Sequence, residues 1–148
     1  MSGDGGLIVV DASIVAKWLI PEKDTPGALA LRSQHRFAAP DILFPEVANI
    51  LWKHVSRGTI SVQDVGDALS ALAYFKPQVL PSQPMFFDAC RLAVELDHPA
   101  YDCFYLLTAA RLGTVMVTAD ERLLRKLAST AALEWSPIAI RLDDVGRL

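Results

Sequence analysis

Four acidic residues stand beside strongly apolar segments of the chain. Asp11 follows the run LIVV at 7–10, and Asp120 follows TVMVT at 114–118. Glu46 opens the stretch EVANILW, and Asp102 opens DCFYLL. An ionised carboxylate in a protein interior costs several kcal/mol unless it is paired or hydrogen-bonded, and a helix N-terminus stabilises it by only about 0.3–1 kcal/mol. The repeated pattern therefore suggests that the four acids share one group that stabilises their charges.

Asp102 raises this question most sharply. It lies in HPAYDCFYLLTAARLG, residues 98–113, which has a proline at its start and apolar residues on all sides. These features predict a buried helix. Either the start of this helix reaches water or a cation lies beside Asp102. Arg111 is nine positions further along the helix, which is too far for it to be that cation.

The remaining segments alternate between strand and helix patterns. Residues 7–10 and 114–118 predict buried parallel strands, FAAPDILFP a short strand or loop, and QVL and SPIAIRL further strands. Helices are predicted for SIVAKWLI, about 25–34, EVANILWKHVSRG, TISVQDVGDALSALAYF with Ser61 as its cap, PSQPMFFDACRLAVELDH, and ERLLRKLA. This alternation predicts a three-layer α/β/α fold around a mostly parallel sheet, in which ligands bind beyond the carboxyl ends of the strands.

Each acid also has an ordinary structural explanation. Asp11 suits a loop or a helix cap, Glu46 suits the first turn of a helix, and Asp120 suits an N-cap that competes with a Thr118–Glu121 capping box. Taken together, the four predict a different role, because helix starts after parallel strands meet at one edge of the sheet. Carboxylates gathered there repel one another unless a hard cation neutralises them, and an all-oxygen donor set suits Mg²⁺ or Mn²⁺.

The bulk composition favours one cytoplasmic domain spanning residues 1–148. Hydrophobic residues make up 52% of the chain, but no apolar run approaches the ~20 residues of a membrane-spanning helix. The N-terminus MSGDGG lacks the basic segment of a signal peptide. A net charge of −3 argues against a basic coat for nucleic acid, although the charge outside four metal-binding acids would be positive. Cys90 and Cys103 are expected to be buried reduced thiols.

Four segments also resemble a known family in order and spacing: VVDASIVAKWLIPE, APDILFPEVANILWK, HPAYDCFYLLTAARLG and VTADERLL. Over nearly the whole chain they resemble PIN-domain proteins of the VapC toxin type. The resemblance implies a parallel sheet flanked by helices and a metal-dependent endoribonuclease that leaves a 5′-phosphate and a 3′-hydroxyl. It places the family's acidic quartet on Asp11, Glu46, Asp102 and Asp120. An additional acid found in some members has no clear counterpart here.

The resemblance also suggests a role for each residue. Asp11 and Asp102 are expected to bind Mg²⁺ or Mn²⁺ directly, Asp120 directly or through water, and Glu46 as a ligand or as the base that positions water. Ser13 and Thr118 stand where the family often places hydroxyls near the metal. The basic residues that could hold RNA are Lys17, Lys53, Arg57, Arg122 and Arg125, although the sequence favours a solvated surface charge for each of them. No catalytic role is expected for His35, His54 or His98, and core or interface packing rather than base stacking is expected for Trp18 and Trp52.

Other functions fit the sequence less well. A haloacid-dehalogenase-type phosphatase needs a second Asp two residues after the first, where this chain has Ser13, and the acidic pair and lysine of a phosphate-receiver domain are not evident. The serious alternative is a PIN fold that binds RNA or protein without cleavage, which the intact quartet argues against. The VapC resemblance further implies a homodimer and an antitoxin partner lying across the apolar helices at 14–20, 46–57 and 61–75.

Overall fold

A five-stranded, fully parallel sheet forms the centre of the computed structural model, which describes residues 5–20, 25–129 and 134–147. The strand order is β3-β2-β1-β4-β5. The bounds are Leu7–Val10 for β1, Arg36–Pro40 for β2, Gln78–Leu80 for β3, Met116–Thr118 for β4 and Ala139–Arg141 for β5. Every strand predicted from the sequence is present, and the three-layer α/β/α class is confirmed.

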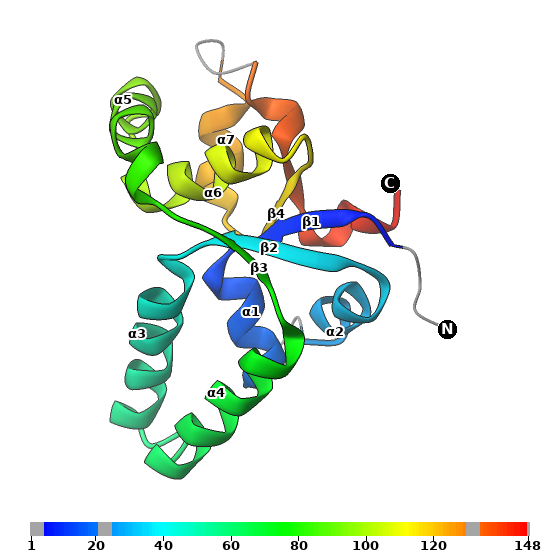
Figure 1. The fold of residues 1–148 in the computed structure, drawn as a ribbon, viewed down its shortest axis with the longest axis vertical. Helices are drawn as coiled ribbons and strands as arrows, with labels where there is room; N and C mark the ends of the chain where they lie inside the picture. The colour runs from blue at the N-terminus through cyan, green and yellow to red at the C-terminus, as the bar shows by residue number, and fades with distance from the viewer. Residues whose placement is uncertain (1–4, 21–24, 130–133, 148) are drawn as a thin grey trace.

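Helices cover both faces of the sheet (Figure 1). On one side lie α1 (Ala12–Leu19), α2 (Thr25–Gln34), α3 (Leu43–Ser56) and α4 (Val62–Phe75), and on the other lie α5 (Phe86–Leu96), α6 (Ala100–Arg111) and α7 (Glu121–Leu127). Short 3₁₀ turns occupy Gln83–Met85, Ser136–Ile138 and Leu142–Arg147. None of the helices in the described part of the chain has the length and apolarity needed to cross a membrane.

The core lies where α1 and α6 pack against opposite faces of the central strands. In α1 the residues from Ile14 to Trp18 are all buried, and the Trp18 indole N–H donates to the carbonyl of Ala28 at 2.7 Å. In α6, Tyr105 and Leu106 are fully buried. The expected helix is present as Ala100–Arg111 and is buried from Tyr105 to Ala109, but it is not buried on all sides, because Tyr101 in its first turn is 61% exposed. Because α1 and α6 pack tightly against the sheet, the first residues of both helices are held in fixed positions at the sheet edge.

Two local expectations need correction. Helix α3 begins at Leu43, so Glu46 lies in its first turn rather than at its first residue. Cys103 is buried, but Cys90 is exposed, because it lies outside the stripe of α5 that faces the core through Ala89, Leu92 and Leu96.

The N-terminal caps of two other helices were also predicted from the sequence. One prediction is confirmed, and the structure decides between two alternatives for the other. Ser61 caps α4 as predicted, within a capping box formed with Asp64. The start of α7 is capped by Asp120, which accepts a hydrogen bond from the Leu123 N–H. The competing box between Thr118 and Glu121 does not form, because the Thr118 hydroxyl accepts from the Asp120 N–H instead and donates to Asp11.

Candidate functional site

The strand order reverses between β1 and β4, and the candidate site lies at this point. From β1 the chain continues to β2 and β3 on one side, whereas β4 and β5 lie on the other. Val10 and Val117 are neighbours in the parallel register, so both strands end at the same edge. Asp11 immediately follows β1, and Asp120 lies two residues beyond the end of β4. Ligands of open parallel sheets bind in the crevice formed at such a reversal.

Asp11 is the most firmly held of the four acids. It is 5% exposed, and its Oδ1 accepts hydrogen bonds from the Ser13 hydroxyl at 2.6 Å and the Ile14 N–H at 3.0 Å. Its Oδ2 accepts from the Thr118 hydroxyl at 2.6 Å. The bond from Ile14 makes Asp11 the N-cap of α1. The two hydroxyls that the sequence singled out therefore orient this carboxylate.

One pocket of about 350 Å³ brings the four acids together. It is lined by Asp11, Ala12, Ser13, Lys17, Glu46, Ile50, Asp102, Ala119 and Asp120. The acids reach it from four elements: the ends of β1 and β4 and the first turns of α3 and α6. The geometry thus places the predicted quartet around one space, although a role for each residue stays a prediction.

The electrostatics of the pocket disfavour four ionised carboxylates. Burial, reinforced by the charges of Asp102 and Asp11, raises the pKa of Glu46 to about 7. Burial, with contributions from Asp11 and Asp120, raises the pKa of Asp102 to about 6. Burial likewise raises the pKa of Asp11 against the opposing effect of its hydrogen bonds. Loss of water is the larger cause in each case, and repulsion between the acids adds to it.

Glu46 carries an oxygen with no hydrogen-bond donor. Its Oε1 is buried without a partner among the described residues, and so is the hydroxyl of Tyr105. Tyr105 is close enough to lower the pKa of Glu46, but the two groups do not reach hydrogen-bonding geometry. A buried carboxylate oxygen without a hydrogen-bond donor lowers the stability of the folded protein. This oxygen is therefore suited to bind a cation that enters the pocket.

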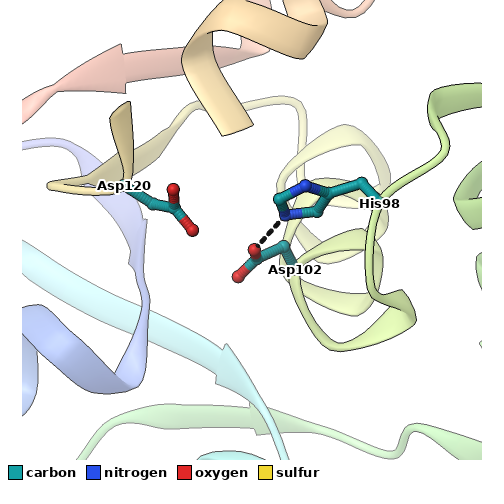
Figure 2. Close-up of side chains that lie close together, drawn as sticks. All are labelled: His98, Asp102 and Asp120. Carbon is teal, nitrogen blue, oxygen red and sulfur yellow. Dashed lines mark hydrogen bonds and ion pairs between the residues drawn. The ribbon is translucent and has the colours of Figure 1, made fainter. Parts of the chain in front are cut away.

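Sequence reasoning missed His98, which lies beside Asp102. Its Nε2 is 2.5 Å from Asp102 Oδ2, and Figure 2 shows the imidazole directed at that carboxylate with Asp120 facing them. His98, Asp102 and Asp120 each offer one potential ligand atom, and these atoms lie within 4.8 Å of one another. The four-residue spacing between His98 and Asp102, just ahead of a predicted helix, was the signal available. Arg111 forms an ion pair with Asp88 instead, as its distance along the helix predicted.

The basic and aromatic candidates divide by location. Lys17 is 9% exposed and lines the acidic pocket, so the expectation of a solvated surface charge is wrong for it. Lys53 lines a neighbouring pocket of about 470 Å³ together with Glu46 and Tyr101. The other basic candidates, Arg57, Arg122 and Arg125, are exposed. Trp18 packs in the core as expected, whereas Trp52 is 61% exposed and contributes no core packing.

Known proteins share both the sequence pattern and the fold. A sequence profile of the PIN domain matches residues 8–129. Ribonuclease VapC3 from Pyrobaculum aerophilum is 33% identical over 122 residues, which cover 80% of this chain and 93% of that protein. The crystal structure of PAE2754 from Pyrobaculum aerophilum aligns with a TM-score of 0.67 at 23% identity, covering 98% of this chain and 90% of that one. The structural likeness concerns the fold alone.

Proposed function

The chain belongs to the PIN-domain family, and from this membership we propose that it is a metal-dependent endoribonuclease, the toxin of a type II toxin–antitoxin pair. The observation that carries the proposal is the convergence of Asp11, Glu46, Asp102 and Asp120 on one pocket where the strand order reverses. A PIN fold that only binds RNA or protein is the alternative. It would have no need to keep four carboxylates around one pocket, where burial raises the pKa of Asp11, Glu46 and Asp102.

The donor set of the pocket fits a hard divalent cation. Asp102 Oδ1 and Asp120 Oδ2 accept no hydrogen bond from the described residues, and Glu46 Oε1 is buried without one. Such oxygens are the ligands that Mg²⁺ and Mn²⁺ prefer. We assign Asp11 and Asp102 as direct ligands, Asp120 as a direct or water-mediated ligand, and Glu46 as a ligand or a base.

Hydrolysis of a phosphodiester requires a nucleophilic water and relief of the charge on the leaving oxygen. A divalent cation in this pocket would supply both, by acidifying water and by neutralising the phosphate. Glu46, whose pKa is raised to about 7, is suited to accept the proton from the attacking water near neutral pH. Ser13 and Thr118 keep Asp11 in one orientation. The product is a 5′-phosphate and a 3′-hydroxyl, with no covalent intermediate.

The neighbouring pocket is the proposed path of the RNA. It shares Glu46 and Ile50 with the acidic pocket and adds Lys53, Asn49 and Tyr101. Lys53 would neutralise a phosphate, and the 61% exposed ring of Tyr101 offers a surface on which a base can stack. A strand running through this pocket would bring a phosphodiester to the carboxylates.

The test is RNA cleavage by the purified protein with Mg²⁺, with Mn²⁺ and with EDTA. Wild type is compared with Asp11→Asn and Asp102→Asn, and Asp97→Asn serves as a control because its side chain is 99% exposed. We expect cleavage by wild type and the control in Mg²⁺ or Mn²⁺, at least 100-fold less by the two pocket variants, and none in EDTA. Equal cleavage by all four proteins would point to a contaminating nuclease and overturn the assignment.

Partner surfaces are proposed on the helices that the sequence predicted. An apolar groove of about 220 Å³ runs between α1, α3 and α4 and includes Leu19, Phe44, Leu51, Val65 and Leu69. We assign it to an amphipathic segment of the antitoxin. Further apolar side chains are exposed on α5, which supports a second interface between copies of this chain; they are Phe86, Phe87 and Val94.

Co-purification from the native host tests the groove. We expect Leu69→Glu to abolish capture of a small partner protein, while light scattering across a dilution series still detects a dimer. A monomer at every concentration, with no captured partner for wild type, would contradict both interfaces.

We also propose that residues 1–148 form one domain that acts in the cytoplasm.

A further inference from the structure

His98 lies between the end of α5 and the start of α6, beside Asp102 of the acidic pocket, and we propose that it is a positioning residue that holds the Asp102 carboxylate for metal binding. The inference rests on the proposed function, since it concerns the same site. It is carried by the contact between the His98 imidazole and Asp102, which Figure 2 shows beside Asp120.

The backbone of His98 has little freedom. Its N–H donates to the Ala93 carbonyl at 3.1 Å, closing the C-terminal turn of α5 around Asp97, which has a left-handed φ of 49°. This arrangement is a Schellman-type helix end. Pro99, with its restricted φ, follows directly as the N-cap of α6. The position of the imidazole is thus set by two helix ends rather than by a loop.

The side chain is equally restricted. Its relative exposure is 3%, against 20% for the side chain of Asp102. Nε2 lies 2.5 Å from Asp102 Oδ2, whereas Nδ1 is buried with no partner among the described residues. A proton on Nδ1 would meet no acceptor there, but a proton on Nε2 meets a carboxylate. We therefore assign the proton to Nε2, which donates to Oδ2.

This hydrogen bond sets the direction of the carboxylate. It uses Oδ2 and leaves Oδ1 available to a metal ion, since Oδ1 accepts no hydrogen bond from the described residues. Asp102 and Asp120 offer oxygens within 4.8 Å of each other. Without a donor at Oδ2, repulsion would favour rotation of the Asp102 side chain toward water. Loss of such a supporting contact to a metal ligand typically weakens metal binding 10–100-fold.

The short distance argues against the imidazole itself being a ligand. Two donors that bind one ion side by side, each at about 2.1 Å, lie about 3 Å apart. His98 Nε2 and Asp102 Oδ2 are closer than that, and the proton between them accounts for the contact. His98 thus acts on the metal through Asp102.

A matched pair of variants tests this role. In His98→Gln the side-chain amide nitrogen can occupy the place of Nε2, whereas in His98→Asn the amide is too short to reach Asp102. His35→Asn is the control, because His35 lies ahead of β2 at the opposite edge of the sheet. The binding constants of Mn²⁺ alone and Mg²⁺ alone are measured by calorimetry, and thermal unfolding in EDTA verifies that each variant is folded.

We expect His98→Asn to weaken binding of both ions 10–100-fold, His98→Gln to remain within about fivefold of wild type, and His35→Asn to match wild type. In cleavage, His98→Asn should need more Mn²⁺ but approach the wild-type kcat at saturation. Unchanged affinity in His98→Asn would overturn the positioning role while leaving the metal site intact. Loss of Mn²⁺ affinity alone, and equally in both His98 variants, would overturn it by making the imidazole a ligand. Failure of wild type to bind either ion would overturn the proposed metal site and this role together.

Discussion

Replacing Asp102 by asparagine should stabilise the metal-free protein at neutral pH. Burial raises the pKa of this carboxyl from 3.8 to about 6. The folded protein therefore holds the proton more tightly than the unfolded chain, so stability is greatest below about pH 4 and falls as the pH rises toward 6. At ~1.4 kcal/mol per pH unit across this interval, the loss reaches about 3 kcal/mol as an upper limit. Asparagine keeps an acceptor for His98 but carries no charge.

Urea unfolding in EDTA at several pH values between 4 and 7 measures this effect. We expect Asp102→Asn to match wild type at pH 4 and to exceed it by up to about 3 kcal/mol at pH 7. A shallower decline should remain in the variant, because the raised pKa of Glu46 acts with the same sign up to about pH 7. Asp97→Asn should follow the wild-type curve. Parallel curves for wild type and Asp102→Asn, or a variant less stable at pH 7, would refute the argument from burial.

Three further outcomes follow from the local structure. Gly5→Ala should lower the free energy of unfolding by about 1–3 kcal/mol, because its Cβ would lie 1.4 Å from the carbonyl oxygen that ends α2; Gly6→Ala, with open space around it, is the control in the same denaturation assay. Cys90 should react with a thiol reagent in the folded protein and Cys103 only after unfolding, because burial raises the pKa of Cys103 to about 12; equal rates for both thiols would contradict this. Ser61→Ala should cost about 1 kcal/mol in urea unfolding by removing the cap of α4, and an unchanged midpoint would show that the capping box contributes nothing.

The elements were predictable from the sequence because local patterns dominate them. The apolar β-branched run at 7–10 and the proline-led helix at 100–111 are consistent with their burial in the structure. The convergence of the acids was also predictable, since parallel strands end at one edge. The start of α3 was not, because Leu43 and Phe44 extend the helix ahead of Glu46 without a cap signal, and its N-cap makes no side-chain hydrogen bond.

Contacts between elements were harder to predict. Lys17 is buried because α1 packs against α2, α3 and α4, a tertiary arrangement that the segment SIVAKWLI does not encode locally. The contact of His98 with Asp102 was not predictable, because the turn that directs the imidazole at Asp102 depends on how α5 ends against α6. The exposure of Cys90, in contrast, was available from helical spacing, since its neighbour Ala89 belongs to the buried stripe.

All four carboxylates belong to helix starts: Asp11 and Asp120 are N-caps, and Glu46 and Asp102 lie in first turns. Each start stabilises an anion by about 0.3–1 kcal/mol, so the scaffold itself offsets part of the repulsion in the pocket. We therefore expect the chain to fold before any ion binds. On the proposed function, a newly made molecule without bound metal is folded but catalytically inactive. Chelation of the metal would return the protein to this inactive state, and added metal ions would restore its activity without refolding.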